Sequence, residues 1–504
     1  MTTETSKANQ HQQNGANAAS AGNAASGGSA ANAGNAGSAG SAVSAVPRAS
    51  AKTLTMALTL TVTLAMTLTL TGCAREAPVE TPAVDPAFNA EMAELLEDST
   101  VFTASFVWNG YSDGFVEQGA VVVREGRVLS VFSTENQPLP ESGIDVVDLG
   151  DVYVTPGIIN AHGHIGMADG LATGPEVYSE DLVRRQLATY AHYGVTSVVS
   201  LGDEPPEAFA VRDAMPDYAP GNARLWVAGD VLDPESVDEA RQQVAIAAET
   251  NPDWVKIRVD SQLGRQTPMP APVYQQVIER SHDYELPLAS HMVTLDHSKG
   301  LLRAGSDLLA HSVRDAEVDD ELIELMLARD ICITPTLTRE VSTFVYAERP
   351  DFFDDPWFRQ TVADDVIEQL QDPQVQANYR TEDAAYYRQA LPLAEQNMIR
   401  LHEAGVRVAM GTDSGPPARF QGYFEHLEMQ MMEDAGMSPV DVMRSATSVA
   451  AACMGLGDAI GRLDVGYWAD FVTFSENPLA SMDNLRSLEQ VFIAGERFES
   501  PFVR

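Results

Sequence analysis

The sequence is poor in lysine and in positive charge as a whole. Its 504 residues contain 32 Lys and Arg against 72 Asp and Glu, which gives a formal net charge of −40. A field of that sign repels phosphate backbones and anionic lipid surfaces, which argues against a nucleic-acid partner. Lysine occurs at only four positions, so a lysine inside an apolar segment points to a role other than solubility.

Cysteine is also scarce, with Cys73, Cys332 and Cys453 in the whole chain. Three cysteines cannot form a disulfide framework, and we expect Cys332 and Cys453, which lie in apolar runs, to act as packing residues. The 44% hydrophobic content excludes a disordered protein. It suffices for one large barrel with an accessory domain, or for two to three ordinary domains.

The first 99 residues differ in composition from the rest of the chain. Residues 1–52 are a low-complexity segment of Ala, Gly, Ser and Asn, which we expect to be disordered. Residues 53–73 form an uncharged Leu- and Thr-rich run with a basic flank and small residues before Cys73, as in secretory signal peptides. The last four residues resemble a bacterial lipobox, which implies cleavage before Cys73 and its lipidation. Residues 74–99 are rich in Pro and acidic residues and indicate a tether.

The resulting expectation is an exported protein, lipid-anchored to the bacterial cell envelope. Ala74 after the cysteine would place it on the periplasmic face of the outer membrane in a Gram-negative cell. Two alternatives stay open: an uncleaved membrane helix, since the run is near the lower length limit for spanning, and a strand without a partner sheet. A start at Met56 is also open, and it would remove the basic flank.

The remaining sequence predicts an α/β fold. From residue 156 to 455, short apolar runs alternate with amphipathic helical stretches, giving eight βα units and no G-x-G-x-x-G motif. This pattern favours a (β/α)8 TIM barrel over an open doubly wound sheet. Residues 100–155 and 456–504 consist of short strands, and we expect a small β-sandwich domain formed from both flanks of the barrel.

One connection in the predicted barrel is unusually long. More than fifty residues, rich in Phe, Trp and Tyr, separate the seventh strand from a helix at Leu393. In a barrel this connection lies at the carboxyl-end face, where active sites form. We therefore interpret residues 345–392 as a lid insertion, with an inert subdomain or a dimer contact as the alternative.

The strongest functional signal is the position of four of the ten histidines. His162 and His164 end the first predicted barrel strand, and their spacing of two directs both rings to the same side. His291 and His311 end the fifth and sixth strands, and Asp413 ends the eighth. The barrel gathers these side chains at one face. Imidazole and carboxylate groups at that spacing predict a metal site, although a single His at a strand end is more often structural.

Lys256 lies inside the apolar fourth strand, where an unpaired ammonium is costly to bury. Arg258, two residues further on, shares its face of the strand. A contact with a substrate carboxylate is one interpretation of Arg258, and a structural role is the other. His297 also has two interpretations: it faces the substrate, or it is a residue at the start of a helix.

The segments that contain these histidines, Lys256 and Asp413 resemble the amidohydrolase superfamily, in particular its extracytoplasmic prolidase-like and imidazolonepropionase-like members. The matching segments are VTPGIINAHGHIG, PDWVKIRVD, LASHMVTLDHSKGLLRAGSDLLAHS, VRVAMGTDSG, MSPVDVMRSATSVA and GRLDVGYWADFVTF, and they span roughly residues 100–500. The sequence departs from the family pattern at Gly163, where a bulkier residue is usual, and in the length of the insertion.

The resemblance implies a binuclear centre with two Zn2+. His162, His164 and Asp413 would bind one zinc, and His291 and His311 the other. Lys256 would carry carbon dioxide as a carbamate (N6-carboxylysine) and bridge the two metals. In the implied mechanism, a hydroxide shared by the metals attacks the carbonyl, and Asp413 passes a proton to the leaving nitrogen.

The predicted function is therefore hydrolysis of amide bonds in a small-molecule substrate, such as a dipeptide or an N-acyl amino acid. The same metal site would also serve a hydrolase of esters, lactones or cyclic amides. An alternative of another class is a non-catalytic ligand-binding lipoprotein, which predicts a missing metal ligand. The sequence leaves the oligomeric state open, with a homo-oligomer as one option, and cobalt or manganese could replace zinc.

Overall fold

The computed structural model describes residues 92, 94–216 and 221–502. The predicted disordered segment, the signal peptide with Cys73, and most of the tether lie outside these residues. Within them, no helix has both the length and the apolar character needed to cross a membrane.

The described chain has the predicted barrel-type α/β fold. Seven of its parallel strands are β6 (Ile158–Gly163), β9 (Val195–Ser200), β10 (Arg224–Val227), β12 (Val255–Arg258), β13 (Leu288–His291), β14 (Leu308–Ala310) and β15 (Cys332–Thr334). The eighth predicted strand, 407–412, forms only isolated parallel bridges. One joins Val408 to Ile333, and a second joins Ser414, just beyond it, to Gly163. In the described residues no ladder joins β10 to β11 (Val231–Leu232), so the ring of hydrogen-bonded strands is not closed there.

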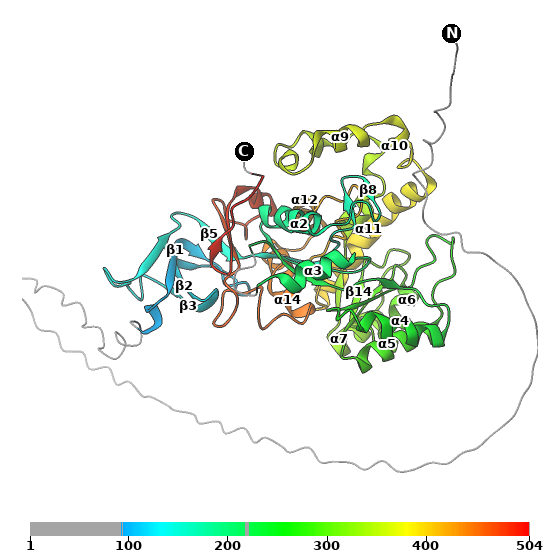
Figure 1. Cartoon of the computed structure of the whole chain (residues 1–504), viewed down its shortest axis with the longest axis horizontal. Helices are drawn as coiled ribbons and strands as arrows, with labels where there is room; N and C mark the ends of the chain where they lie inside the picture. Colours follow the sequence, from blue (N-terminus) through cyan, green and yellow to red (C-terminus); the bar gives the residue numbers. More distant parts are fainter. Residues whose placement is uncertain (1–91, 93, 217–220, 503–504) are drawn as a thin grey trace, which may run out of the picture. The chain divides into compact units, whose positions relative to one another are not determined.

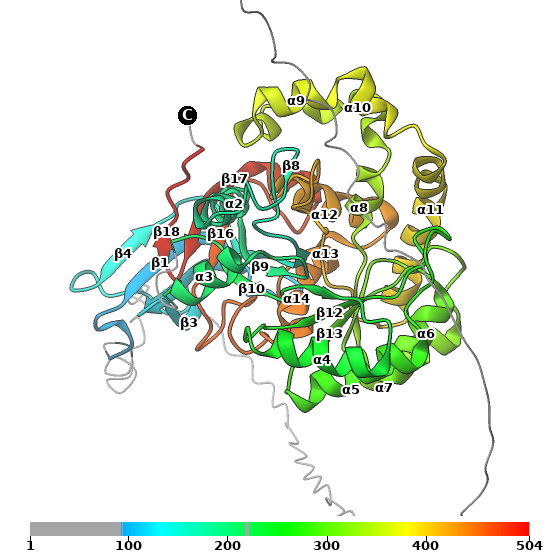
Figure 2. The same ribbon diagram turned by 45° about the vertical axis from the view of Figure 1, so that its right-hand side comes forward.

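Helices follow most of the strands. They are α2 (Glu180–His192), α3 (Pro206–Ala214), α4 (Val237–Ala248), α5 (Ala271–Asp283), α6 (Leu295–Ala304), α7 (Asp320–Arg329), α11 (Glu382–Glu403), α12 (Tyr423–Ala435), α13 (Pro439–Ser445) and α14 (Ser448–Cys453). Four of these helices, α2, α4, α6 and α7, begin at an N-cap residue whose side chain accepts a hydrogen bond from a backbone N–H of the first turn. The N-cap residues are Ser179, Ser236, Thr294 and Asp319. Helices α4 to α7 lie side by side against the strands (Figures 1 and 2).

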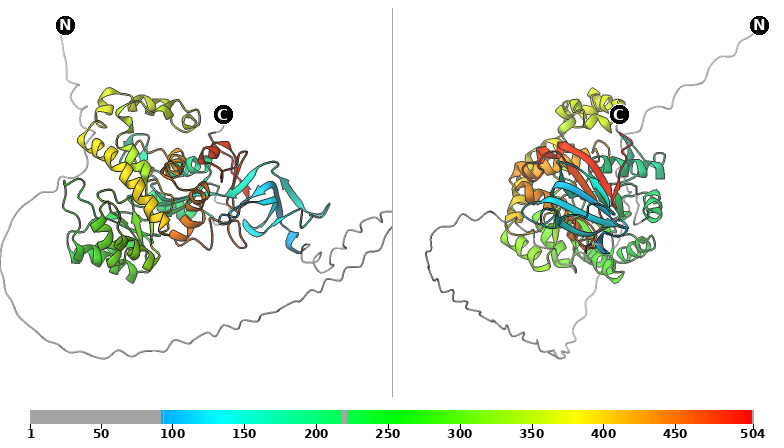
Figure 3. Two further views of the ribbon diagram at one scale, coloured as in Figure 1. Left: turned by 180° about the vertical axis from the view of Figure 1, so that it is seen from behind. Right: turned by 90° about the vertical axis from the view of Figure 1, so that its left-hand side faces the viewer.

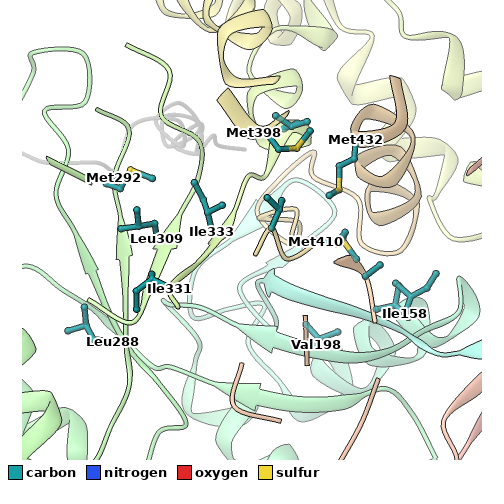
Figure 4. Close-up of a cluster of buried hydrophobic side chains, with 14 of the residues drawn as sticks. Ile158, Val198, Leu288, Met292, Leu309, Ile331, Ile333, Met398, Met410 and Met432 are labelled. Atoms are coloured by element: carbon teal, nitrogen blue, oxygen red, sulfur yellow. The ribbon is translucent and has the colours of Figure 1, made fainter. Parts of the chain in front are cut away.

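Alternation along the strands separates two apolar cores. On β12, Val255 and Ile257 pack outward in the core shared with the helices. Figure 4 shows part of this core, with side chains from the strands beside Met398 of α11 and Met432 of α12. Trp254 packs in a second cluster with Ala289 of β13, so the alternate positions of the strands share the opposite face. Lys256 follows Trp254 by two residues and therefore lies on that inner face.

The structure corrects the interpretation of two cysteines. Cys332 and Cys453 are packed in the inner cluster, as expected, but they are also joined as a disulfide with a Cα–Cα distance of 5.8 Å. The sequence separation of 121 residues hid this pairing. The fold brings the start of β15 against α14, which places both thiols in the same apolar cluster.

Strands from both flanks of the barrel form one eight-stranded sheet. Its members are β1 (Thr100–Val107), β2 (Val116–Arg124), β3 (Arg127–Ser133), β4 (Asp145–Asp148), β5 (Tyr153–Pro156), β16 (Phe471–Phe474), β17 (Leu488–Ile493) and β18 (Glu496–Arg497). The antiparallel pair β5–β16 joins the two flanks, and Figure 3 shows the amino-terminal strands beside the carboxyl-terminal ones. Along one edge of β1, the first half of the strand pairs with β4 and the second half pairs with β5, so two strands share this edge. The domain boundaries given above stay predictions.

The long connection after β15 is a helical segment with its own aromatic core. It contains α8 (Leu337–Ser342), η1 (Val345–Ala347), η2 (Asp351–Asp354), η3 (Phe358–Gln360), α9 (Asp364–Leu370), α10 (Pro373–Ala377) and the first half of α11. The seventh strand, which the sequence predicts over 332–337, therefore ends three residues early at Thr334, because Leu337 already begins α8. Tyr346, Phe353 and Phe358 are fully buried and pack with Tyr423 and Phe424 of α12. Three short elements lie elsewhere: β7 (Ala168–Asp169), β8 (Ala172–Thr173) and η4 (Met482–Ser487).

Candidate metal centre

All six predicted site residues line one cavity of about 350 Å³, called here the metal cavity. They are His162, His164, Lys256, His291, His311 and Asp413, and each is at most 8% exposed. The side chains come from the carboxyl ends of four barrel strands, β6, β12, β13 and β14, and from the segment after 407–412. His297 does not line this cavity; it lies in the first turn of α6.

His162, His164 and Asp413 form the tightest group. Their ligand atoms all lie within 4.8 Å of one another, a spacing that allows one metal ion to contact all three. The Nε2 atoms of His164 and His162 lie 2.6 and 3.7 Å from Oδ1 of Asp413.

The other three residues lie against this group. Nζ of Lys256 is 3.2 Å from Nε2 of His162. The ring of His311 is centred 4.9 Å from that of His162 and 4.3 Å from that of His291. Lys256 therefore lies beside the first three ligands, and His311 links them to His291.

Polar partners orient the histidine rings from behind. Nδ1 of His162 contacts Oγ1 of Thr334 at 3.2 Å, and Nδ1 of His164 contacts the Gly202 carbonyl at 2.7 Å. Nδ1 of His311 contacts Oγ1 of Thr336 at 2.7 Å. These contacts leave the Nε2 atoms directed into the cavity, the arrangement that metal-binding histidines commonly show.

His291 is held through its other ring nitrogen. Its Nε2 lies 3.3 Å from Oδ2 of Asp260, which leaves Nδ1 available. Burial is the main cause that lowers the pKa of His291 to about 3, although Asp260 opposes the shift. Burial also lowers the pKa of His162 and His311 well below the ordinary value, which favours the neutral form that binds metals.

Two site residues have left-handed backbone conformations. The φ angles of His311 and Asp413 are 77° and 57°. Strict alternation from Leu309, which packs outward, would direct His311 away from the cavity. The positive φ instead brings its ring against His291. Such conformations cost about 1–3 kcal/mol each and are concentrated at functional sites.

The carboxylate of Asp413 is surrounded by positive and polar groups. Burial would raise its pKa, but the Arg419 guanidinium and His164 outweigh burial and hold the pKa of Asp413 well below its usual range. One Arg419 nitrogen lies 2.6 Å from Oδ2 of Asp413, and Nε of Arg339 lies 3.8 Å from the same oxygen. Asp413 is therefore ionised across the neutral pH range.

Two buried glutamates support the ligands from below. Oε1 of Glu425 accepts hydrogen bonds from Asn160, Thr412 and Ser414 at 2.6–2.7 Å, so it clamps the residues on either side of Asp413. Glu204 accepts from the Gly202 N–H at 2.7 Å, which holds the carbonyl that contacts His164.

Sequence reasoning missed several residues of the metal cavity: Asp260, Arg339, Tyr387 and Arg419. Asp260 follows Lys256 and Arg258 at the same spacing of two residues, and this spacing was a signal that its side chain lies on the same face. Arg339 lies on the short helix α8, Arg419 in the irregular segment after Asp413, and Tyr387 on α11. No spacing rule predicts where such side chains point.

The donor set fits a divalent transition metal. Imidazole nitrogens and a carboxylate oxygen converge within ligand distance, and the ring nitrogens not facing the cavity have hydrogen-bonding partners. A protonated Lys256 has the wrong charge for such a site. Burial is the main cause that lowers its pKa to about 8, which brings the neutral amine within reach near neutral pH.

Comparison with known proteins decides the family. Residues 153–498 match the family model described as the Amidohydrolase family. The chain belongs to the amidohydrolase family. As an amidohydrolase it is a hydrolase that acts on carbon–nitrogen bonds, and its His-His-Asp cluster agrees with the metal dependence typical of the family.

Individual relatives are distant. An imidazolonepropionase of Pseudomonas entomophila (strain L48) is 23% identical over 377 residues, covering 71% of this chain and 88% of the relative. The crystal structure of a Xaa-Pro dipeptidase with bound methionine in the active site aligns with a TM-score of 0.65 at 20% identity, covering 80% of this chain and all of that one. Ochratoxinase from A. niger aligns with a TM-score of 0.61 at 19% identity, covering 80% of this amidohydrolase and 96% of that chain. At these identities the structural likeness establishes the fold.

Proposed function

We propose that this amidohydrolase is a binuclear zinc enzyme that cleaves amide bonds of dipeptides or N-acyl amino acids. The observation that carries the proposal is the convergence of His162, His164 and Asp413 on one point, with Lys256 and the His291–His311 pair beside it. A single metal would need only the first three. The further buried ligands support a second metal position.

Lys256 would join the two positions as a carbamate. Its neutral amine attacks carbon dioxide, a C–N bond forms, and one proton leaves to solvent, so that a cation becomes an anionic oxygen ligand. Its burial at 3% exposure and its contact with His162 support this conversion, because an ammonium there would repel any bound metal.

The residues of the site have separate tasks in the reaction. Bound zinc lowers the pKa of water and polarises the scissile carbonyl. Asp413 takes the proton of the attacking water at its carboxylate and delivers it to the leaving nitrogen. Its low pKa keeps it in the accepting form, and the histidines and Glu425 hold its position.

The test combines metal analysis and turnover on the purified full chain. We expect close to two zincs per chain, a mass increase of one carbon dioxide on Lys256, and hydrolysis within a panel of dipeptides and N-acyl amino acids. One metal or none, with Lys256 unmodified, would contradict the binuclear assignment. Two metals with turnover only on esters, lactones or cyclic amides would favour that second group of substrates. Two metals without any turnover would favour a ligand-binding lipoprotein.

We also propose export and lipid anchoring at Cys73. The signal-like segment 53–73 supports this, as does the Cys332–Cys453 disulfide, because disulfides persist mainly in oxidising compartments. Membrane fractionation of cells that express the full chain tests it. Wild type is expected with the membranes and Cys73→Ser in the released fraction, and equal distribution of the two would contradict the anchor. Size-exclusion chromatography with light scattering decides between a monomer and a homo-oligomer.

A further inference from the structure

A second cavity adjoins the metal cavity. It has a volume of about 590 Å³ and shares Pro416 and Arg419 with the metal cavity. Its walls come from the β7–β8 hairpin, α2, the segment 361–369 of the insertion, and the loop after Asp413. We call it the lid cavity. Because the two cavities meet at Arg419, one extended ligand can occupy both.

The buried part of the lid cavity is apolar. Leu182, Val362 and Ala418 are each at most 9% exposed. The buried amide of Gln186 is already satisfied, because it donates to the Ala168 carbonyl and accepts from the Gly166 N–H, both at 2.7 Å. The ion pair of Arg185 with Asp169 is half exposed and lies at the rim. The buried side chains of this lining therefore suit an apolar group, whereas Thr361, Arg419 and Gln421 contribute polar atoms to it.

Arg258 offers a different kind of contact in the metal cavity. Among the described residues, its guanidinium has no hydrogen-bonding or ion-pairing partner, whereas Arg265, Arg339 and Arg419 are paired with Asp383, Glu340 and Asp413. Arg258 lines the metal cavity together with the candidate ligands, and on β12 it is paired in register with His291 of β13. Its guanidinium is thus close to the candidate ligands and free to bind an anion.

Arg258 and the lid cavity lie on opposite sides of the metal ligands. Arg258 ends β12, the fourth strand around the barrel, whereas the lid cavity is built on the loops after β6 and after the segment 407–412, the first and eighth. In a ring of eight strands, the fourth lies across from the eighth. A ligand that extends from Arg258 to the lid cavity therefore passes over the candidate ligands.

We propose that the amidohydrolase acts on N-acyl amino acids whose carboxylate pairs with Arg258 and whose apolar acyl group lies in the lid cavity. The guanidinium matches a carboxylate in a bidentate pair, and the scissile amide then lies between the two cavities. A dipeptide would instead place its ammonium against the buried apolar side chains of the lid cavity, where burial of an unpaired charge is costly. The inference rests on the proposed function and selects one of its two substrate groups.

Turnover by the zinc-loaded full chain tests the inference. The substrates are N-octanoyl-L-alanine, N-acetyl-L-alanine, L-alanyl-L-alanine and N-octanoyl-L-alaninamide. We expect kcat/KM for N-octanoyl-L-alanine to exceed that for each of the others by at least about tenfold, since burial of methylene groups and a charged pair both add affinity. A preference for L-alanyl-L-alanine would overturn the inference and leave amide hydrolysis intact.

Matched variants assign the two ends of the substrate. Arg258→Met is expected to abolish the preference for the carboxylate over the carboxamide, and Arg258→Lys to keep part of it. Val366→Trp fills the lid cavity and is expected to abolish the preference for octanoyl over acetyl. The controls are Arg241→Met on exposed α4 and Val375→Trp on α10, which does not line the cavity. Unchanged preferences in Arg258→Met and Val366→Trp would overturn the inference.

Calorimetric binding of N-octanoyl-L-alanine to the metal-depleted full chain separates the two proposals. We expect binding by wild type and a loss of at least about tenfold in Arg258→Met and in Val366→Trp, with both controls unchanged. Binding of this kind without turnover after zinc loading would support the inference while the proposed reaction fails. Absence of binding by the wild-type chain would contradict the inference.

Discussion

The ligands of the metal cavity and the aromatic core of the insertion after β15 are both buried, yet different forces hold them together. Around Asp413, the flanking Thr412 and Ser414 each donate a hydrogen bond of 2.6 Å to Glu425, which fixes their positions. In the insertion, aromatic rings such as Phe353 and Phe358, stacked with centroids 5.8 Å apart, make the core. Directional hydrogen bonds hold one geometry, whereas apolar packing stabilises a segment without specifying each contact as tightly.

This contrast indicates in which of the two regions a substitution is better tolerated. Loss of a buried polar partner leaves other groups unsatisfied and disturbs the ligands directly. Loss of a ring in the insertion leaves a void that the neighbouring side chains can partly fill. We therefore expect changes below the metal cavity to affect metal binding and changes in the insertion to affect stability and substrate affinity.

The largest expected effect is that of Asp413→Asn. The amide cannot accept the proton from water, so kcat should fall by about 10³-fold or more while zinc still binds. Steady-state kinetics with elemental analysis of the same preparation measures both. Activity within tenfold of wild type would contradict the assignment of Asp413 as the proton carrier.

Lys256→Ala tests the proposed bridge between the two metals. Without the carbamate both positions lose a ligand, and we expect most of the metal and nearly all turnover to be lost. Short carboxylic acids supplied in the buffer could restore part of the activity by replacing the missing anionic ligand. Two zincs retained per chain in the variant would rule out the bridging role.

Glu425→Ala should destabilise the fold and weaken metal binding together. Three side-chain donors on one buried oxygen lose their acceptor, which we expect to cost about 3–5 kcal/mol of unfolding free energy. Denaturant unfolding and a zinc titration measure the two effects, with Glu425→Gln as a milder comparison. Unchanged zinc affinity would show that this network does not position the ligands.

Phe353→Ala is the corresponding change in the insertion. The ring is fully buried, so its removal should cost about 3–4 kcal/mol. We expect the zinc content to stay at the wild-type value while KM rises, because only the walls of the lid cavity loosen. If metal were lost as readily as in Glu425→Ala, the separation of the two regions would be wrong.

The smallest effect concerns pH. Burial lowers the pKa of His426 on α12, against the Trp357 ring of the insertion, to about 4. The unfolded value is about 6.5, so the stabilisation is complete above about pH 6.5 and is lost as the pH falls toward 4. When the pH falls from about 7 to about 4.5, the free energy of unfolding of wild type should fall by about 2 kcal/mol more than that of His426→Gln, which lacks the titrating group. Parallel unfolding curves at the two pH values check this.

Much of the candidate site was readable from the sequence because of strand geometry. The ends of parallel strands meet at one face, so His162, His291 and Lys256 could be brought together from their positions alone. The boundaries of β15 and α11 were less accurate, since the insertion has no regular period. The Cys332–Cys453 disulfide was missed because the contact depends on how α14 packs below the barrel.

The sequence by itself predicted the barrel-type fold, because alternation and strand order are local properties that repeat along the chain. Its motifs carried the resemblance to the family, and that resemblance implied the six candidate ligands. The tertiary structure alone decided the orientation of His311, the pairing of the cavity arginines and the meeting of the two cavities at Arg419. These features depend on backbone turns and on contacts between segments distant in sequence. No local pattern of residues encodes them.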